Sequence, residues 1–448
     1  MLVATDAGAQ IPLADVIPTM LGPQMTIAPG PGGTHAQDFA LAPGDEDIVL
    51  TDGSFGQLVD APRGSSFSGA VAEQLTRFPI GSSSGGFLYE FDPVVGTFTR
   101  VTRTFGSSYG ERPWTSGRGT LSVGLSVQSI DYDRFADTPL DGGDLRFYFV
   151  HRDVRRNGYG QPFLDRSLTP ENSDVMEAAL RLRIHSRTVA TTVTYGLANR
   201  VDIGVVIPMV ETTLNVQLDK RILRLGTASD PTIHSFDGLG SDTATATGGG
   251  TASGLGDVRV QVKYNVVRYE FLSVAAVGDV RLPTGDSDNL LGRGRLFTRM
   301  AGIVSTGTRV FSPRATVGVV LGRSEDTGQG TFLDDEINYT FGADWSVVPR
   351  ATLSADLLVR TQHSTGTFLS FVDRELRSVR SAGGPVVTQT VRESVFTAAP
   401  DSQLMQMALG GKVNPWRTFL VTGNVLLPVF SHALRNKPAI SFGVEYTF

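Results

Sequence analysis

The 448-residue chain contains no cysteine, which excludes a disulfide framework, a thiolate metal site and a thiol nucleophile. It also lacks any apolar run of about 18 residues, so a membrane-spanning α-helix is excluded. Charged residues are 19% of the chain, the net charge is −6, and no basic run occurs. We therefore expect no nucleic-acid partner. The length is compatible with two or three soluble domains or with one closed β-barrel.

The last nine residues alternate between apolar and polar side chains. Ile440, Phe442, Val444, Tyr446 and Phe448 are apolar, and small or polar residues lie between them. This period of two predicts a β-strand with one apolar face and one polar face. A strand of a soluble β-sandwich alternates in the same way, so the assignment depends on whether other segments repeat the pattern.

The alternation recurs through much of the chain after residue 118. It marks residues 121–127, 258–266 and 272–280, and then three pairs, 296–306 with 315–321, 337–347 with 353–359, and 405–413 with 419–427. The connections inside the pairs are short, whereas those between the pairs are long and rich in glycine or charge. Short turns at one end and long loops at the other are typical of an outer-membrane β-barrel.

A hairpin with strands around residues 189–197 and 201–209 belongs to the same series. Further from its turn the apolar residues move to even positions, for example Leu182 in one arm and Leu214 in the other. A change of phase predicts a bulge or a break, so we expect the membrane-crossing parts to be 189–197 and 201–209. Residues 222–253, which are rich in Gly, Thr, Ser and Asp, predict a long extracellular loop.

The N-terminal quarter has little periodicity. Residues 1–9 end in an A-x-A pattern and are interpreted as the remnant of a signal peptide. Residues 10–69 predict an extended segment that contributes little to a core, and 70–78 predict one short helix. Residues 87–101 predict a small hairpin, which either plugs the lumen or adds two strands to the wall.

Together these segments predict an all-β fold. In hydrocarbon every backbone polar group must pair internally, which only a closed sheet allows. We expect a transmembrane antiparallel up-and-down β-barrel of about 12 strands, or 14 with the 87–101 hairpin, over residues 118–448. Residues 10–117 are expected to form an irregular periplasmic or plug-like segment.

Chemical motifs are weak. Residues 81–85 match G-x-S-x-G, but a nucleophile elbow needs a preceding strand and a following helix, and here a strand follows. The six histidines are scattered without ligand spacing. Asp286, Asp288 and Asn289 suggest a calcium-binding turn, but an EF-hand's Glu is absent and a solvated turn is favoured. We expect no catalytic residue, cofactor or metal site.

The polar faces of the predicted strands supply the candidate functional residues. Both signs of charge occur, so a hydrated wall without strong charge selection and a set of charge pairs that only stabilises a closed lumen are both open interpretations. The lumen-lining candidates are Arg259, Lys263, Asp279, Arg281, Asp344, Asp356, Arg360, Lys412 and Glu445.

The C-terminal strand resembles the closing strand of bacterial outer-membrane β-barrels. That resemblance implies a Gram-negative outer membrane and an assembly signal read by the barrel-assembly machinery, carried here by Phe442, Tyr446 and Phe448. Residues 195–205 (YGLANRVDIGV), 254–258 (GLGDV) and 281–292 (RLPTGDSDNLLG) are similar to outer-membrane barrels described as transporters or meta-pathway phenol-degradation proteins. This resemblance covers residues 178–448 and carries over no catalytic residue.

From fold and resemblance we expect a passive channel or uptake transporter for small solutes, including hydrophobic or aromatic ones. Its partners would be outer-membrane lipid and the solute. A structural or adhesive barrel without a conducting pore is one alternative. A lipid-modifying enzyme is another, but it would need a Ser or His constellation on the outer wall, which the sequence does not provide.

Overall fold

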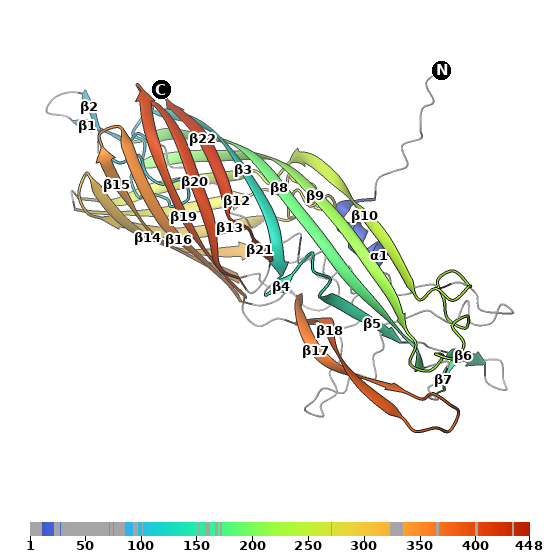
Figure 1. Ribbon diagram of the computed structural model, residues 1–448. Coiled ribbons are helices and arrows are strands. Elements are labelled where there is room, and N and C mark those ends of the chain that lie inside the picture. The colour runs from blue at the N-terminus through green and yellow to red at the C-terminus, as the bar shows by residue number, and fades with distance from the viewer. Residues whose placement is uncertain are drawn as a thin grey trace, which may run out of the picture.

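The chain folds as a closed antiparallel β-barrel (Figure 1). The structure, a computed structural model, describes residues 11–21, 27, 71, 75, 86–92, 97–100, 102–135, 137–150, 153–156, 162–165, 169–170, 173–269, 271–322, 335–363, 367–398, 402–431 and 434–448. None of the described helices is long and apolar enough to cross a membrane.

Twelve strands of the described chain form the wall, each antiparallel to its neighbours. In order around the barrel they are β3 (Leu121–Phe135), β8 (Val175–Ala198), β9 (Val201–Leu223), β11 (Arg259–Arg268), β12 (Leu272–Arg281), β13 (Phe297–Thr306), β14 (Phe311–Gly322), β15 (Asp335–Val348), β16 (Ala351–His363), β19 (Ser402–Trp416), β20 (Phe419–Ser431) and β22 (Ala439–Thr447). The C-terminal strand β22 pairs with β3 and closes the barrel. The predicted fold is therefore confirmed, with twelve wall strands.

The predicted 87–101 hairpin does not join this wall. Its two strands, β1 (Tyr89–Asp92) and β2 (Thr97–Arg100), pair only with each other. Figure 1 shows them at the rim that carries the C-terminus, beside the ends of the barrel strands. The alternative count of fourteen wall strands is therefore wrong.

The outer surface of the barrel is apolar and the inner surface is polar. Outward side chains such as Leu353 (53% exposed), Phe442 (65%) and Met300 (64%) would be unfavourable in water but suit hydrocarbon. Exposed aromatics lie at the short-turn end, which also carries the C-terminus: Tyr195, Tyr264, Trp345, Trp416 and Phe448. Such a band with an aromatic girdle is the surface of an outer-membrane β-barrel.

The change of phase in β8 and β9 is not a bulge, and that prediction is wrong. The two strands pair in one register from Val175 opposite Leu223 to Gly196 opposite Asp202, and the register shifts only at the turn. The odd-numbered side chains point outward throughout. They are apolar near the turn and polar or charged beyond Val189, as at Arg187 and Arg183. The strands leave the bilayer at this level, so their apolar face moves from the lipid side to the interior.

The expectation of a long loop over residues 222–253 is also wrong in part. Strand β10 (Thr243–Leu255) pairs with the outer half of β9 over thirteen residues. Threonines lie on its exposed face, whereas the alanines and all the glycines except Gly249 lie on the inner face. Thr is a good strand former, but Thr, Ala and Gly differ little in hydrophobicity. Their alternation in the sequence therefore did not indicate a strand.

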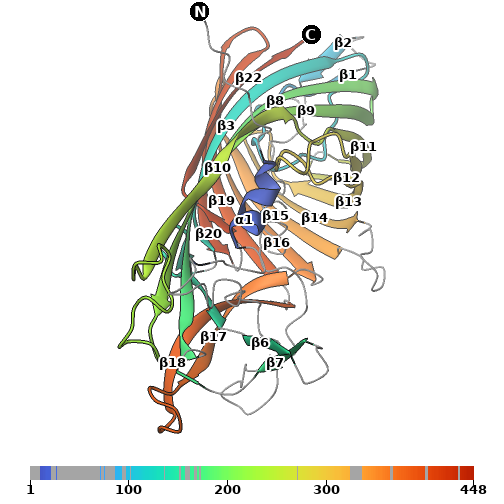
Figure 2. The same ribbon diagram turned by 90° about the vertical axis from the view of Figure 1, so that its right-hand side faces the viewer.

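The inner face of β10 carries only small side chains because a helix packs against it. Helix α1 (Leu13–Met20) packs on β9 and β10 at the long-loop end, with Leu13 and Ile17 almost fully buried (Figure 2). A Cβ on Gly248 would lie 2.8 Å from the Met20 sulfur. The expectation that residues 10–69 contribute little core is thus wrong for α1.

Three predicted features fall wholly or largely outside the described residues. The signal-peptide remnant at 1–9 and the G-x-S-x-G motif at 81–85 lie wholly outside them. Of the predicted helix at 70–78, only Val71 and Leu75 are described, and both are helical and buried.

The remaining described strands lie at the long-loop end of the barrel. They are β4 (Thr138–Pro139), β5 (Leu145–Val150), β6 (Asp153–Arg156), β7 (Pro162–Asp165), β17 (Thr367–Ser378), β18 (Val387–Ala398) and β21 (Leu434–Asn436). The β17–β18 hairpin, which lies in the long connection between the predicted 337–359 and 405–427 pairs, projects beyond the barrel (Figures 1 and 2). Strand β3 continues to Phe135, beyond the alternation seen at 121–127.

Candidate functional site in the barrel lumen

An irregular segment, residues 102–117, crosses the lumen near the short-turn end; we call it the plug segment. It hydrogen-bonds to strands around the barrel. The backbone N–H of Phe105 donates to Thr352 Oγ1 of β16 at 3.0 Å, and Tyr109 Oη donates to Ser441 Oγ of β22 at 3.1 Å. Beside Ser441, Asn424 Nδ2 of β20 donates to Ser108 Oγ at 3.0 Å. These contacts hold the middle of the plug segment against the β16–β22 side of the barrel.

The carboxylate of Asp202 on β9 holds the end of the plug segment. It accepts the Ser116 backbone N–H at 2.9 Å and the Ser116 hydroxyl at 3.2 Å. Lys263 Nζ on β11 lies 3.8 Å from the same carboxylate. Asp202 is 2% exposed, so these partners replace its hydration. Nearby, Asn265 Nδ2 donates to the Pro113 carbonyl at 2.9 Å.

A buried charge cluster stands where the plug segment meets β14–β16. Arg314 is paired with Asp344 at 2.7 Å and also with Asp356, and all three side chains are at most 1% exposed. Arg112 of the plug segment is fully buried and is attracted by Asp344 and Glu445. Burial lowers the pKa of Arg112 to about 10, against the opposing effect of these two carboxylates. Arg112 therefore remains a cation at neutral pH, and its charge binds the segment to the wall.

Glu445, on the closing strand β22, connects this charge cluster to Gly86 and to Lys412 of β19. Its carboxylate accepts the Gly86 backbone N–H at 2.6 Å and lies 3.9 Å from Lys412 Nζ. A small cavity of about 90 Å³ lies beside this pair and is lined mainly by hydroxyl and amide side chains, among them Asn424 and Ser441. This side of the lumen is a neutral, polar passage with one ion pair.

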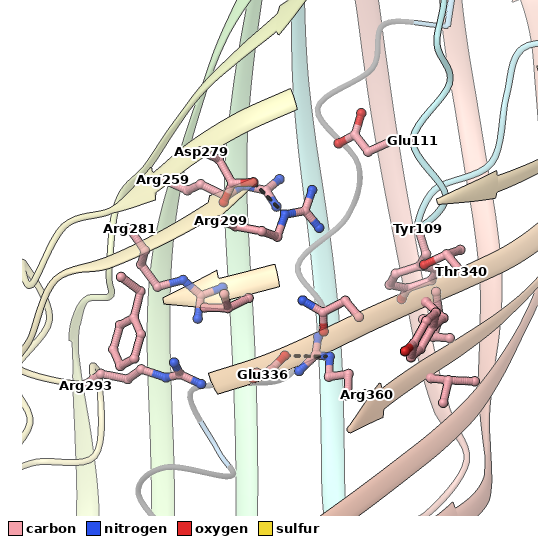
Figure 3. A pocket seen from close by; sticks show the side chains of 16 residues that line it. Tyr109, Glu111, Arg259, Asp279, Arg281, Arg293, Arg299, Glu336, Thr340 and Arg360 are labelled. Carbon is pink, nitrogen blue, oxygen red and sulfur yellow. Dashed lines mark hydrogen bonds and ion pairs between the residues drawn. The ribbon is translucent and has the colours of Figure 1, made fainter. Parts of the chain in front are cut away.

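A larger cavity of about 130 Å³ lies on the other side of the plug segment and is rich in arginine (Figure 3). Five arginines from four strands and one loop line it: Arg259, Arg281, Arg293, Arg299 and Arg360. The carboxylates in its lining are Glu111 of the plug segment, Asp279 and Glu336. Arg299 Nε lies 2.7 Å from Asp279 and Arg360 Nε lies 3.9 Å from Glu336. We call this the arginine cavity.

The arginine cavity also has an aromatic side. Phe297 and Tyr109 line it together with the aliphatic side chains of Val320 and Leu358. The Arg293 guanidinium carbon lies 4.1 Å from the centre of the Phe297 ring, which is cation–π geometry. The cavity therefore offers several guanidinium groups beside an apolar surface.

The candidates chosen from the sequence lie on inward-facing positions. The structure brings Arg259, Asp279, Arg281 and Arg360 together in the arginine cavity. Asp344 and Asp356 meet at Arg314, Lys412 pairs with Glu445, and Lys263 stands beside Asp202. The set is thus divided among four groups of charged residues.

Several residues of the site were not among the candidates. Asp202, Arg299 and Arg314 occupy inward positions of strands, and the same alternation would have included them once the strand bounds were known. Arg112 and Glu111 come from the plug segment, which has no periodicity and therefore gave no signal. Arg293 belongs to the loop after β12.

No group of three or more metal-binding side chains occurs among the described residues. Asp286 caps its own turn, since it accepts the Asp288 N–H at 3.0 Å and the Asn289 side-chain amide at 2.7 Å. His234, which gave no signal in the sequence, is fully buried at the long-loop end, where it pairs with Asp174 at 2.8 Å.

No protein-family model matches the chain, and no curated protein matches it in sequence. Among solved structures it is similar to an outer membrane channel from Pseudomonas putida F1, with 10% identity, a TM-score of 0.41, and coverage of 76% of this chain and 100% of that one. It is also similar to the P. putida toluene transporter TodX, with 10% identity, a TM-score of 0.31, and coverage of 73% and 89%. TM-scores below 0.5 are too low to assign a function. The resemblance to phenol-degradation barrels therefore stays a prediction.

Proposed function

We propose that the protein is an outer-membrane channel for small solutes, closed in the structure described here by the plug segment. The observation that carries the proposal is the arrangement in the lumen. Polar cavities lie on both sides of a segment that is attached mainly by individual hydrogen bonds and charge interactions, with one small apolar contact of Phe105 against Phe87 and Leu420. Polar contacts of this kind can exchange for water, so the segment can leave the lumen without breaking the wall.

The solute would pass in sequence through the arginine cavity, past the plug segment, and through the cavity beside Glu445. Both cavities are small, which favours solutes of one ring or a few carbon atoms. Their mixed lining of hydroxyl, charged and aromatic groups supports small solutes that carry an apolar part. Transport would be passive, because a barrel of this kind offers only a path down the gradient of the solute.

Flux into liposomes tests the proposal. We expect purified full-length protein to admit small solutes at a low rate, and variants with a weakened plug, Asp202→Asn and Glu445→Gln, to admit them faster. Asp219→Asn, on the outer face of the same strand as Asp202, is the matched control and should leave the rate unchanged. A rate equal to that of protein-free liposomes for all variants would rule out a channel.

A structural or adhesive barrel is the second candidate. Two observations favour it: the plug segment crosses the lumen, and the β8–β10 sheet and the β17–β18 hairpin project beyond the barrel. The same flux measurement separates the two candidates, because a structural barrel remains closed when the plug contacts are weakened.

We also propose that the C-terminal aromatics serve assembly. Phe442 and Phe448 are exposed on the outer face, and the Tyr446 and Phe448 rings stack edge to face at 4.7 Å. Exposed, they are accessible to the barrel-assembly machinery before the wall closes. Phe448→Ala should lower the amount of folded protein in the membrane without changing the flux per folded molecule.

A further inference from the structure

We propose that the arginine cavity is a binding site for a small aromatic carboxylate. The inference rests on the proposed channel function, because it names the class of solute that this site would select. Its starting point is the charge of the lining: among the described residues five arginines line the cavity with three carboxylates, and Asp257, which attracts Arg281, brings the nearby carboxylates to four, an excess of one positive charge. Figure 3 shows the guanidinium groups of Arg259, Arg281, Arg299 and Arg293 directed toward a common space.

The excess charge favours an anion over a cation or a neutral solute. Two of the carboxylates already have an arginine within ion-pair distance, Asp279 with Arg299 and Glu336 with Arg360. An incoming carboxylate adds the negative charge that the lining lacks. Guanidinium groups bind carboxylates through two parallel hydrogen bonds, which makes arginine well suited to this anion.

The remaining lining suits an aromatic body on that anion. Phe297 and Tyr109 supply ring faces, and Val320 and Leu358 supply aliphatic contact. The volume of about 130 Å³ is close to the roughly 150 Å³ at which an engineered protein cavity admits benzene. A single six-membered ring is therefore the upper limit for the body of the anion, and a long acyl chain or a fused-ring system is too large.

The position of the cavity gives binding a consequence for the channel. Glu111 of the plug segment is one of its three carboxylates, and Tyr109 of the same segment forms part of its wall. A bound carboxylate adds a negative charge beside Glu111 and repels it. Occupation of the site therefore weakens one attachment of the plug segment and links binding of the solute to opening.

Binding to the full-length protein in detergent is the test, with benzoate as the probe. We expect benzoate to bind, and benzyl alcohol, benzylammonium and acetate to bind at least tenfold more weakly. Arg259→Gln and Arg293→Gln should each weaken benzoate binding about tenfold, because each removes one guanidinium group from the cavity. Both variants leave the Arg299–Asp279 and Arg360–Glu336 pairs in place. Arg183→Gln, an exposed arginine on the outer face of β8, is the matched control and should bind benzoate as the wild type does.

Three results would overturn the inference: no benzoate binding, equal binding of benzoate and benzyl alcohol, or tighter binding of inorganic phosphate than of benzoate. If a variant fails to fold, the ligand series on the wild-type protein still decides between these outcomes. Failure here is distinct from failure of the channel function, since binding is measured without flux. If the protein conducts solutes but does not bind benzoate, the proposed channel function stands and only the proposed class of solute is refuted.

Discussion

Neutralising Asp202 should release the plug segment while the barrel stays folded. The Asp202 carboxylate is 2% exposed and accepts the Ser116 backbone N–H at 2.9 Å and the Ser116 hydroxyl at 3.2 Å. Asparagine has the same shape, but it replaces one acceptor oxygen by an NH₂ donor and removes the charge. Hydrogen bonds to a charged group contribute about 1.5–3 kcal/mol each. Loss of one such bond should make the open form of the segment about tenfold to a hundredfold more populated, at 1.4 kcal/mol per factor of ten.

Hydrogen exchange measures this population directly. In Asp202→Asn, amides of residues 102–117 should exchange about tenfold to a hundredfold faster, while amides of β12–β14 should exchange at the wild-type rate. Asp219→Asn should change neither set. Unchanged protection of the plug segment would refute the role given to Asp202. A uniform loss of protection over the whole wall would also refute it, because it would indicate that Asp202 stabilises the barrel and not the segment.

Three further predictions concern other parts of the molecule. Arg314→Gln leaves Asp344 and Asp356 buried without their shared cation, so the free energy of unfolding by urea should fall by about 3–5 kcal/mol. Adding Asp356→Asn should restore part of this loss. A fall below about 1 kcal/mol in Arg314→Gln would contradict the role of the cluster. Gly196→Ala places a methyl group against the Gly117 carbonyl oxygen, so exchange of residues 115–120 should accelerate, whereas Gly278→Ala, whose Cβ meets open space, should have no effect. Burial acts to raise the pKa of Asp174, but hydrogen bonds from His234, Thr227 and Gly226 outweigh it and hold that pKa below its ordinary value of 3.8. Because the folded pKa is the lower one, this carboxylate stabilises the 226–234 loop fully above about pH 4 and loses that contribution as the pH falls through the folded pKa. In the wild type, amides of the loop should therefore exchange faster at pH 3 than at pH 6 after correction for intrinsic rates. This difference should disappear in Asp174→Asn.

The wall of the barrel was predictable because its signal is local. In β11, β12 and β22 every second residue faces lipid, so the alternation in the sequence gives both the strand and its orientation. In β10 the same alternation exists, but Thr, Ala and Gly differ too little in hydrophobicity to reveal it. The phase change of β8 and β9 was detected correctly but misinterpreted, since it marks the edge of the bilayer and not a fault in the strand.

The site was predictable only in part, because it depends on contacts between distant segments. Arg259, Asp279, Arg281 and Arg360 could be assigned to the lumen one strand at a time. Their convergence depends on the register around the closed wall, which no single strand contains. The plug segment gives no periodic signal, because its hydrogen bonds go to strands around the barrel and not to a partner strand.

The proposal that the plug segment gates a channel is tested most directly by locking the segment reversibly. Ser108 of the plug segment and Asn424 of β20 are joined by a 3.0 Å hydrogen bond, and the chain has no native cysteine. In Ser108→Cys/Asn424→Cys a disulfide, or a short bis-thiol reagent, should fix the segment in the lumen. Solute flux into liposomes should fall to the protein-free rate in the locked state and return after reduction. Equal flux before and after reduction, at the rate of the unlocked protein, would contradict the gate.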